Sequence, residues 1–228
     1  TTLSTLLFSR VGDGDNGTER GEAALRAEGH PILAAVYDRV MSGFERRAGL
    51  SWRRTVLAGC RGRVLDLGCG TGANFPVWRE MEDLELYAAD PDPHMLRRAV
   101  KRAGRLGLPV QTAGAPAERL PYPDGFFDVV VTTLVLCTVG DPAGAVAEAA
   151  RVLKPGGEFR FMEHVRAPGP MGWWQDRLTP LWKRVSGGCH LNRETGATIA
   201  AAFDSVTWES IPTGFPTGRV LLGRGRKR

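Results

Sequence analysis

Short runs of consecutive apolar residues alternate with amphipathic stretches along the middle of the chain. The runs 63–67, 84–90 and 129–134 are continuous and rich in Val, Leu and Ala, as parallel strands buried on both faces are. Between them, 94–106 and 142–152 have the composition and spacing of helices. This alternation predicts an α/β fold built around a parallel sheet. Shorter strands are expected at 109–111 and 158–163, and a helix at 73–80.

The two ends of the chain follow other patterns. Residues 1–29 are polar and rich in glycine, which predicts a mobile N-terminal segment. From Pro31 onwards apolar residues recur at helical spacing, so a helical cap is expected over 30–60. At the other end, 205–211 and 218–222 are expected to form the paired last strands of the sheet.

A longer segment, 166–202, separates the fifth expected strand from the last pair. It carries an aromatic and aliphatic stripe at helical spacing, made of Trp173, Trp174, Leu178, Leu181, Trp182 and Val185. Such a stripe usually packs on the core. Two alternatives stay open, namely a wall of an apolar substrate pocket and a surface that contacts lipid.

Composition narrows the class of protein. A chain of 228 residues with 43% hydrophobic content predicts one globular domain. Its apolar runs are all shorter than the ~20 residues that a membrane span needs, so a cytoplasmic location is expected. The four cysteines lack C-x-x-C spacing, which argues against a disulfide framework and against a structural zinc site, and no metal is expected.

The net charge of +5 is carried largely by arginine. Such a charge can attract nucleic acid or an anionic membrane. Much of the excess lies in the terminal segment 224–228, which we interpret as a solvated tail. Nucleic acid is therefore not an expected partner, and membrane contact is possible without being favoured.

The run 63–67 ends in Gly68-x-Gly70-x-Gly72. Glycines there permit a positive φ and let a ligand approach the backbone closely. A dinucleotide-binding turn has the spacing G-x-G-x-x-G, and a phosphate-binding P-loop continues into Lys-Ser/Thr, so both are excluded. The turn suits the carboxylate end and ribose of a nucleotide-like ligand.

With Asp66 before it, this turn resembles motif I of the class I S-adenosylmethionine (SAM) methyltransferases. The segment 151–157, R-V-L-K-P-G-G, resembles the turn before the fifth strand in the same family and is the more specific of the two signals. The resemblance implies a Rossmann-like, seven-stranded sheet with an N-terminal helical cap. It also implies SAM as cofactor, with S-adenosylhomocysteine as product.

A cofactor pocket follows from this resemblance. Asp90 ends the second strand about 20 residues past the glycines, where a carboxylate binds ribose hydroxyls. Met95 is placed to pack against adenine, and Pro116 stands where the family usually has an Asp for the adenine amino group. The full set of expected cofactor-binding residues is Asp66, Gly68, Cys69, Gly70, Asn74, Asp90, Pro91, Met95, Ala115, Pro116, Ala117, Thr133 and Leu134.

The end of the fourth strand bears on the substrate. Residues 132–135, T-T-L-V, offer neither a carboxamide nor a stacking aromatic ring, which disfavours methylation of bases or amides. The strings L-V-L-C at 134–137, F-M-E-H at 161–164 and G-C-H-L-N-R-E at 188–194 resemble the alkyl-thiol S-methyltransferases of vertebrates and their bacterial relatives. This implies transfer to the sulfur of a small molecule, a secondary metabolite or xenobiotic.

Other functions stay open beside this one. The same group grades into phospholipid N-methyltransferases, which act at a membrane surface, and quinone C-methyltransferases. A SAM-binding protein without catalysis is a third possibility.

His164 ends the fifth strand, where ligands gather, and a neutral imidazole there is a candidate base for a thiol proton. A histidine bonded within the strand corner is an equally good interpretation. Cys137 has apolar neighbours and is expected to be a small buried residue rather than a nucleophile. The residues expected to contact the acceptor are Tyr37, Trp173, Cys189 and His190.

Overall fold

The computed structural model describes residues 49–228. The mobile segment expected at 1–29, most of the helical cap expected at 30–60, and Tyr37 lie outside the described residues. The described chain begins with the helix α3 (Leu50–Leu57), which leads into the first strand.

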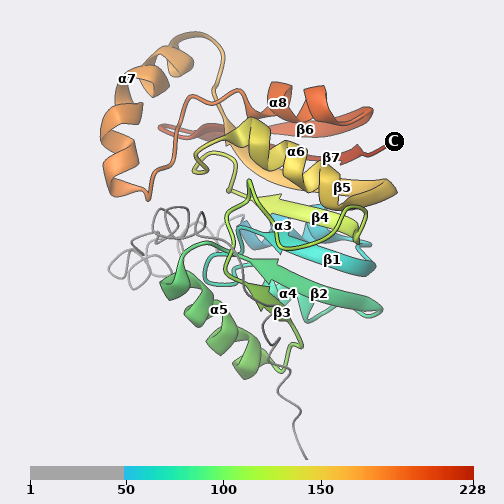
Figure 1. The fold of residues 1–228 in the computed structure, drawn as a ribbon. Helices are drawn as coiled ribbons and strands as arrows, with labels where there is room; N and C mark the ends of the chain where they lie inside the picture. The colour runs from blue at the N-terminus through green and yellow to red at the C-terminus, as the bar shows by residue number, and fades with distance from the viewer. Residues whose placement is uncertain (1–48) are drawn as a thin grey trace, which may run out of the picture.

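A seven-stranded sheet with the order β3-β2-β1-β4-β5-β7-β6 forms the centre of the described chain (Figure 1). Neighbouring strands from β3 to β5 are parallel, and β7 is antiparallel to both β5 and β6. The expected seven-stranded, Rossmann-like α/β fold is therefore confirmed. The strands are β1 (Gly62–Leu67), β2 (Leu84–Ala89), β3 (Gln111–Ala113), β4 (Phe127–Thr133), β5 (Leu153–Val165), β6 (Ser205–Gly214) and β7 (Gly218–Arg226).

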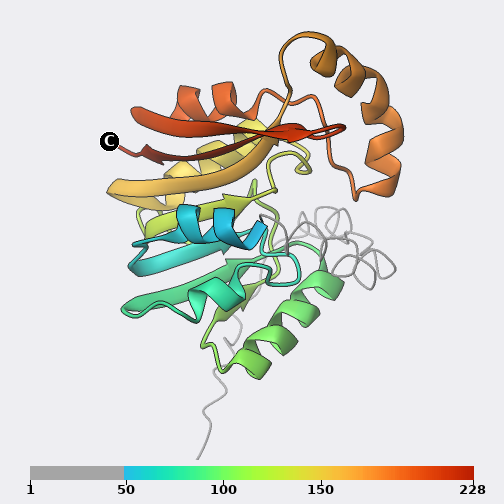
Figure 2. The ribbon, with the colours of Figure 1, turned by 180° about the vertical axis from the view of Figure 1, so that it is seen from behind.

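Helices cover both faces of the sheet. On one face α3 contacts α4 (Phe75–Trp78), which contacts α5 (Pro93–Leu106); on the other, α6 (Pro142–Val152) contacts α8 (Thr195–Ala202). Figure 2, the view from behind, brings α3 and α4 to the front. The helix α7 (Gly169–Val185) stands apart from both layers, beyond the end of the sheet.

The core has two parts because successive side chains of a strand point to opposite faces. On β4, Val130 packs into the cluster under α6 and α8, whereas Val129 and Val131 pack into the cluster under α3, α4 and α5. Phe159 and Trp78, one from each cluster, are fully buried. Each such side chain stabilises the fold by ~1.5–3 kcal/mol relative to exposure.

Several expected boundaries differ from the structure. The last two strands, expected at 205–211 and 218–222, extend to Gly214 and Arg226, so most of the segment 224–228, expected to be a solvated tail, is paired in the sheet. The helix expected at 73–80 is the four-residue α4, because residues 71–74 form a turn that uses Asn74 in a buried hydrogen-bond network. The strand expected at 109–111 lies at Gln111–Ala113, where it pairs with Tyr87 to Ala89 of β2. The strand expected at 158–163 extends in both directions, since Leu153 also pairs with Phe127 of β4.

The segment expected as an insert, 166–202, contains two different elements. Its second half, α8, belongs to the helical layer on the sheet, and only α7 with the loop after it stands apart (Figure 1). Within the part of the chain that the structure describes, no helix is both long and apolar enough to cross a membrane.

Candidate active site

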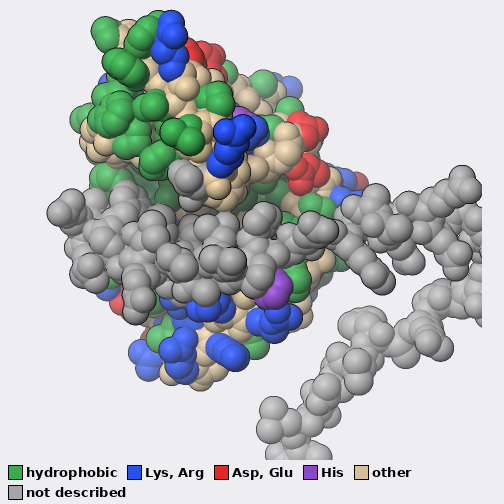
Figure 3. Space-filling view, turned by 90° about the vertical axis from the view of Figure 1, so that its left-hand side faces the viewer, with side chains coloured by type: hydrophobic (Ala, Val, Ile, Leu, Met, Phe, Trp, Pro, Cys, Tyr) green, Lys and Arg blue, Asp and Glu red, His purple; other side chains and the backbone are tan. Residues whose placement is uncertain are grey.

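A cavity of about 920 Å³ lies at the carboxyl ends of the parallel strands, the edge where ligands bind in open α/β sheets. Figure 3 faces this edge, with the apolar side chains of the α7 region above and the basic residues of α5 below. The described residues that line the cavity include both the glycine turn after β1 and the ends of β4 and β5. One cavity therefore joins a nucleotide-binding edge to a second region of different chemistry.

The glycine turn is fastened to the end of β2. The backbone N–H groups of Gly68 and Cys69 donate to the Ala89 carbonyl at 2.8 and 3.0 Å. Gly70 donates its N–H to Asp90 Oδ2, and Asp92 donates its N–H to Asp90 Oδ1, both at 2.9 Å. Each Asp90 oxygen keeps a lone pair for a further donor, such as a ribose hydroxyl.

Burial raises the pKa of Asp90 above its usual range, although the two backbone N–H donors act in the opposite direction. A ligand that adds hydroxyl donors would further favour its ionised form. Asp90 is thus a preformed acceptor at the edge of the cavity.

Glycine is required in the turn for steric reasons as well as for its backbone angles. Gly68 has φ +68°, and a Cβ built on it would lie 2.5 Å from Val135 Cγ1. A Cβ on Gly70, at φ +54°, would meet no atom within 4 Å. The close packing at Gly68 brings the glycine turn against the segment that follows β4.

Behind the cavity lies a buried polar network. Asn74 Nδ2 donates to Asp66 Oδ1 at 2.8 Å and Trp78 Nε1 donates to Asp66 Oδ2 at 2.9 Å. Arg53 donates to Asn74 Oδ1 and to Thr133 Oγ1, each at 2.7 Å. The expected cofactor residues Asp66, Asn74 and Thr133 therefore lie behind the cavity lining, where they join α3 and α4 to β1 and β4.

Burial raises the pKa of Asp66 to about 6, even though both donors stabilise the carboxylate. Arg53, a member of this network that was not among the expected site residues, is 2% exposed despite its charge. A buried arginine beside a polar turn has no distinct pattern in a single sequence.

The start of α5 forms the next wall. Asp92 caps the helix by accepting from the N–H groups of His94 and Met95 at 2.7 and 3.3 Å. Met95 lines the cavity together with Ala115 and Ala117, which come from the loop after β3. These small and flexible apolar side chains suit a flat aromatic ring such as adenine. Pro91 also lines the cavity, whereas Cys69 and Pro116 are not among its described lining residues.

The end of β4 is strained where it meets the cavity. Leu134 has φ +62°, a left-handed conformation that a branched side chain rarely adopts. The next two backbone N–H groups, of Val135 and Leu136, donate to Glu163 Oε1 and Oε2 at 3.0 and 3.1 Å. Burial raises the pKa of Glu163 to about 7 despite these donors. Glu163 therefore holds in place the turn that carries Cys137.

Cys137, His164 and Cys189 meet on the cavity wall, although they are far apart in the sequence. Cys189 Sγ lies 3.7 Å from Cys137 Sγ, 3.7 Å from His164 Nε2 and 3.8 Å from His164 Nδ1. The four cysteines are free thiols in the structure. Cys137 and Cys189 lie together without C-x-x-C spacing because residues from separate loops converge at the carboxyl edge of the sheet.

Electrostatics distinguish the two thiols. The pKa of Cys189 is lowered by its hydrogen bond with Cys137 and by the neighbouring His164. The same hydrogen bond, together with burial, raises the pKa of Cys137. Burial alone would lower the pKa of His164, but the Cys189 thiolate raises it above its ordinary value. This corner of the cavity stabilises a thiolate next to a cationic ring.

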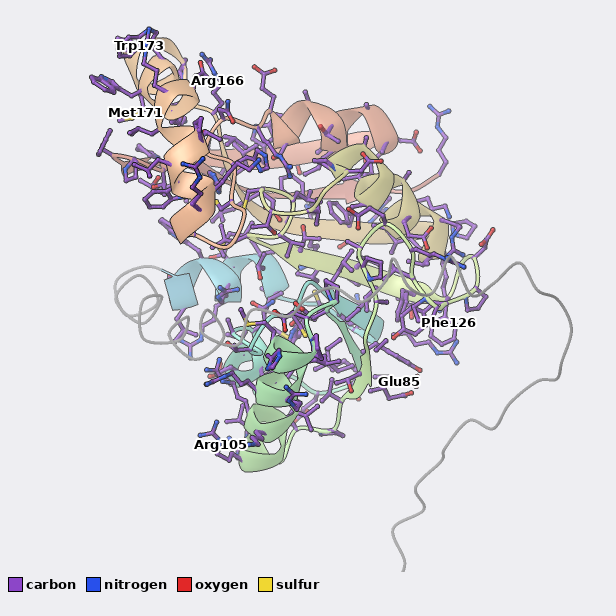
Figure 4. The ribbon with its side chains drawn as sticks, turned by 60° about the vertical axis from the view of Figure 1, so that its left-hand side comes forward. Glu85, Arg105, Phe126, Arg166, Met171 and Trp173 are labelled. Atoms are coloured by element: carbon purple, nitrogen blue, oxygen red, sulfur yellow. The ribbon has the colours of Figure 1, made fainter. Side chains whose placement is uncertain are left out.

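Two expected acceptor contacts lie elsewhere. Trp173 is 47% exposed, packs edge-to-face against Trp174 and lies at the outer end of α7 (Figure 4), away from the cavity lining. His190 is not among the described lining residues either, and its N–H donates to the Cys137 carbonyl at 2.8 Å. The indole rings that do line the cavity are Trp52 and Trp182, and helical periodicity cannot single out Trp182 from the other residues of the stripe.

This fold and this cavity define a methyltransferase of the class I, SAM-dependent type. Residues 65–161 match the family model described as a methyltransferase domain. Human thiol S-methyltransferase TMT1B is 38% identical over 182 residues, which cover 75% of this chain and 74% of the human protein. Human thiol S-methyltransferase TMT1A is 36% identical over 144 residues, covering 61% and 58% of the two chains. The chain therefore belongs to the SAM-dependent methyltransferase family that contains these proteins.

A solved structure supports the fold independently. The YcgJ protein of Bacillus subtilis superposes with a TM-score of 0.67 at 20% identity, covering 79% of this chain and 99% of that one. At that identity the similarity concerns the fold.

The described residues also fit the cofactor. Asp90 offers a preformed acceptor for ribose hydroxyls, Gly70 leaves its surroundings open to a ligand, and Met95, Ala115 and Ala117 form an apolar wall. A volume of about 920 Å³ is near the top of the ~300–1,000 Å³ range of ligand pockets. It has room for a nucleotide-sized donor and a small acceptor together.

Proposed function

We propose that this protein transfers a methyl group from SAM to the sulfur of a small-molecule thiol, such as a secondary metabolite or a xenobiotic. The observation that carries the proposal is the Cys137–His164–Cys189 corner, which shares one cavity with the cofactor-binding edge and stabilises a thiolate. The 38% identity to human thiol S-methyltransferase TMT1B supports the same acceptor atom.

SAM, when bound, supplies a methyl group on a positively charged sulfur. The chain's own residues hold the two reactants in line, since alignment is the main requirement of such a displacement. Asp90 binds the ribose, the glycine turn faces the carboxylate end, and Met95 with Ala115 and Ala117 packs against adenine. The other cofactor-binding residues predicted from the sequence are part of this proposal. Asp66, Asn74 and Thr133 lie behind the cavity wall and hold it in position.

The acceptor occupies the other half of the cavity. His164 takes the thiol proton when its ring is neutral, that is, when the proton that it shares with Cys189 rests on the Cys189 sulfur. Cys189 lies next to the acceptor sulfur. The sulfur lone pair then attacks the methyl carbon, and the bond to the sulfonium breaks with its electron pair staying on that sulfur. Opposite charges are neutralised in this step, so an apolar cavity that excludes water favours it.

An acceptor panel tests the proposal. An alkyl thiol, its matched alcohol and its matched amine are incubated separately with the enzyme and SAM, and release of S-adenosylhomocysteine is measured. We expect the thiol to react at least tenfold faster than either analogue, because a thiolate forms far more readily near neutral pH. Equal rates for the three would reject sulfur as the acceptor. Phosphatidylethanolamine and a quinol in the same panel test the N- and C-methylation alternatives.

A second candidate function is action at a lipid surface. On α7, Trp173, Trp174 and Leu181 are 47%, 49% and 61% exposed, and Arg177 stacks over the Trp173 ring at 4.0 Å. Exposed indole rings beside a cation are typical of helices that lie in a membrane interface. Sedimentation with anionic vesicles at low salt tests this function. Binding that is lost in Trp173→Gln/Trp174→Gln supports it, and protein that stays in the supernatant rejects it.

A further inference from the structure

Three soft or borderline ligand atoms converge on the acceptor side of the cavity. The Sγ atoms of Cys137 and Cys189 and a ring nitrogen of His164 all lie within 4.8 Å of one another. All three residues line the cavity. They therefore surround a point that is open to a small molecule on the remaining side.

Two of the separations are close to those between zinc ligands, and the third, between Cys137 and His164, is within 4.8 Å. A tetrahedral zinc ion bonded at ~2.3 Å to sulfur and ~2.0 Å to nitrogen sets its ligands ~3.8 Å apart for two sulfurs and ~3.5 Å for sulfur and nitrogen. The observed separations are 3.7 Å between the two Sγ atoms and 3.7 Å between Cys189 Sγ and His164 Nε2. The two sulfurs also lie much farther apart than the ~2.05 Å of a disulfide.

The loops that carry the two cysteines are tied together. His190 donates its N–H to the Cys137 carbonyl at 2.8 Å, and Arg193 donates to the Leu136 carbonyl at 2.6 Å. On the opposite side, the Glu163 carboxylate accepts from the N–H groups that precede Cys137. Hydrogen bonds of this kind around a ligand set hold it in place before the ion binds.

We propose that Cys137, His164 and Cys189 bind a zinc ion, and that its fourth position takes the acceptor thiol as a thiolate. Two thiolates and one imidazole form a donor set that selects zinc or copper(I) over harder cations. Three protein ligands with one open position are the arrangement of catalytic rather than structural zinc sites. This inference takes its substrate, a small-molecule thiol, from the proposed function. It differs in that the zinc ion, rather than His164 acting as a base, promotes formation of the thiolate.

The step balances with the metal present. The acceptor R–SH loses its proton to water at the cavity mouth as its sulfur bonds to zinc. A sulfur lone pair then forms the new bond to the methyl carbon, while the sulfonium bond breaks and its electron pair stays on the cofactor sulfur. The product R–S–CH₃ is neutral, binds zinc weakly and is replaced by the next thiol. In the loaded enzyme His164 is a ligand, and the ion takes over the lowering of the thiol pKa.

Metal content is the first test. The full chain is purified from zinc-supplemented cells without chelators, and zinc per chain is measured by mass spectrometry. We expect about one zinc per chain, and a loss of at least tenfold in affinity for zinc in Cys137→Ala, Cys189→Ala and His164→Gln. Cys60→Ala is the matched control, because Cys60 is buried, as Cys137 is, but lies in the core under α3. Retained SAM binding shows that each variant is folded.

Cobalt substitution gives a readout that does not depend on methyl transfer. Co²⁺ in a site with two thiolates has an intense thiolate-to-metal charge-transfer band, and an added thiol substrate should alter that band if its sulfur becomes a ligand. The proposal is overturned if the cobalt spectrum does not change when the thiol is added. It is also overturned if the purified protein contains no zinc and methylates thiols at full rate in the presence of a chelator. A Cys137–Cys189 disulfide in the purified protein overturns it as well.

These results are separable from the proposed function. Thiol methylation that is unaffected by metal removal leaves the proposed function standing and rejects the zinc site. If the protein contains zinc and its cobalt spectrum responds to the thiol, but no thiol is methylated, the metal site is supported and the proposed reaction is rejected. If chelation lowers thiol methylation at least tenfold and added zinc restores it, the result supports both the zinc site and the proposed reaction. The control Cys60→Ala should respond to chelation and zinc in the same way as the wild type.

Discussion

The Asp90 carboxylate accepts the backbone N–H of Gly70 at 2.9 Å and so joins the end of β2 to the glycine turn after β1. Its other oxygen accepts the N–H of Asp92 at the same distance. Both oxygens are thus oriented before a ligand arrives, and their remaining lone pairs face the cavity.

Asp90→Asn should weaken SAM binding by at least about tenfold, or ~1.4 kcal/mol. An asparagine has only one acceptor oxygen, so its NH₂ group would face one of the two backbone N–H groups and the turn would shift. Isothermal titration calorimetry with SAM measures the change. Asp204→Asn, which removes a surface ion pair with Arg228, is the control and should leave affinity unchanged. Equal affinity of the two variants would remove Asp90 from the ribose site.

Gly68→Ala should destabilise the fold by more than Gly107→Ala does. Both glycines have a positive φ, +68° and +62°, so both variants bear the ~1–2 kcal/mol cost of a left-handed alanine. Only at Gly68 would the new Cβ meet a neighbour, Val135 Cγ1 at 2.5 Å. We expect an additional ~1–3 kcal/mol from this overpacking, measured as a difference in the free energy of unfolding in urea. Equal losses would mean that the turn adjusts freely.

The sequence predicted the sheet and the cofactor edge because their patterns are local. The apolar run before Gly68, the acid at Asp90 and the turn at 151–157 each lie within a few consecutive residues. Local runs of this kind determine where strands end, and parallel strands bring their carboxyl ends to one edge. Asp90 could therefore be placed at the cavity without any knowledge of the tertiary contacts.

The acceptor side could not be predicted in the same way. Cys137 and Cys189 come from different loops, and their contact depends on the path of α7 and on the hydrogen bond between His190 and the Cys137 carbonyl. For the same reason, helical periodicity could not tell that Trp173 points outward whereas Trp182 lines the cavity. Which face of an amphipathic helix meets a ligand is decided by tertiary packing.

The stability of the protein should depend on pH through Asp66. Its carboxyl is fully buried, with its pKa raised from 3.8 to about 6 in the folded state. Between these two values the unfolded chain ionises the group while the folded chain keeps it protonated, so the free energy of unfolding falls as pH rises. The contribution is ~3 kcal/mol once pH exceeds the folded pKa.

Urea unfolding at pH 4.5 and pH 7 tests this dependence against Asp66→Asn. The variant lacks the titrating group, so the difference in stability between variant and wild type should shift in favour of the variant as pH rises. A difference that stays constant across this range would assign the pH dependence to other groups. The comparison between two pH values cancels the constant effect of the altered hydrogen bonds with Asn74 and Trp78.

The last prediction concerns the reactivity of the metal-free thiols. Among the four cysteines, Cys189 alone has a lowered pKa, and it lines the cavity. Burial raises the pKa of Cys60 and Cys69, and the hydrogen bond with Cys189 together with burial raises the pKa of Cys137. The thiolate is the form that reacts with alkylating agents. In chelator-treated protein at pH 6, iodoacetamide should therefore modify Cys189 at least about tenfold faster than the other three.

Peptide mass spectrometry over a time course measures the rate at each cysteine. His164→Gln should slow the modification of Cys189 at pH 6, because the cationic ring that stabilises its thiolate is gone, and should alter the rate less at pH 9, where a thiol ionises unaided. Cys60→Ala should leave the rate at Cys189 unchanged. If all four cysteines react at similar rates at pH 6, the thiolate-stabilising corner does not exist in solution, and the chemical basis for placing a thiol acceptor beside it is lost.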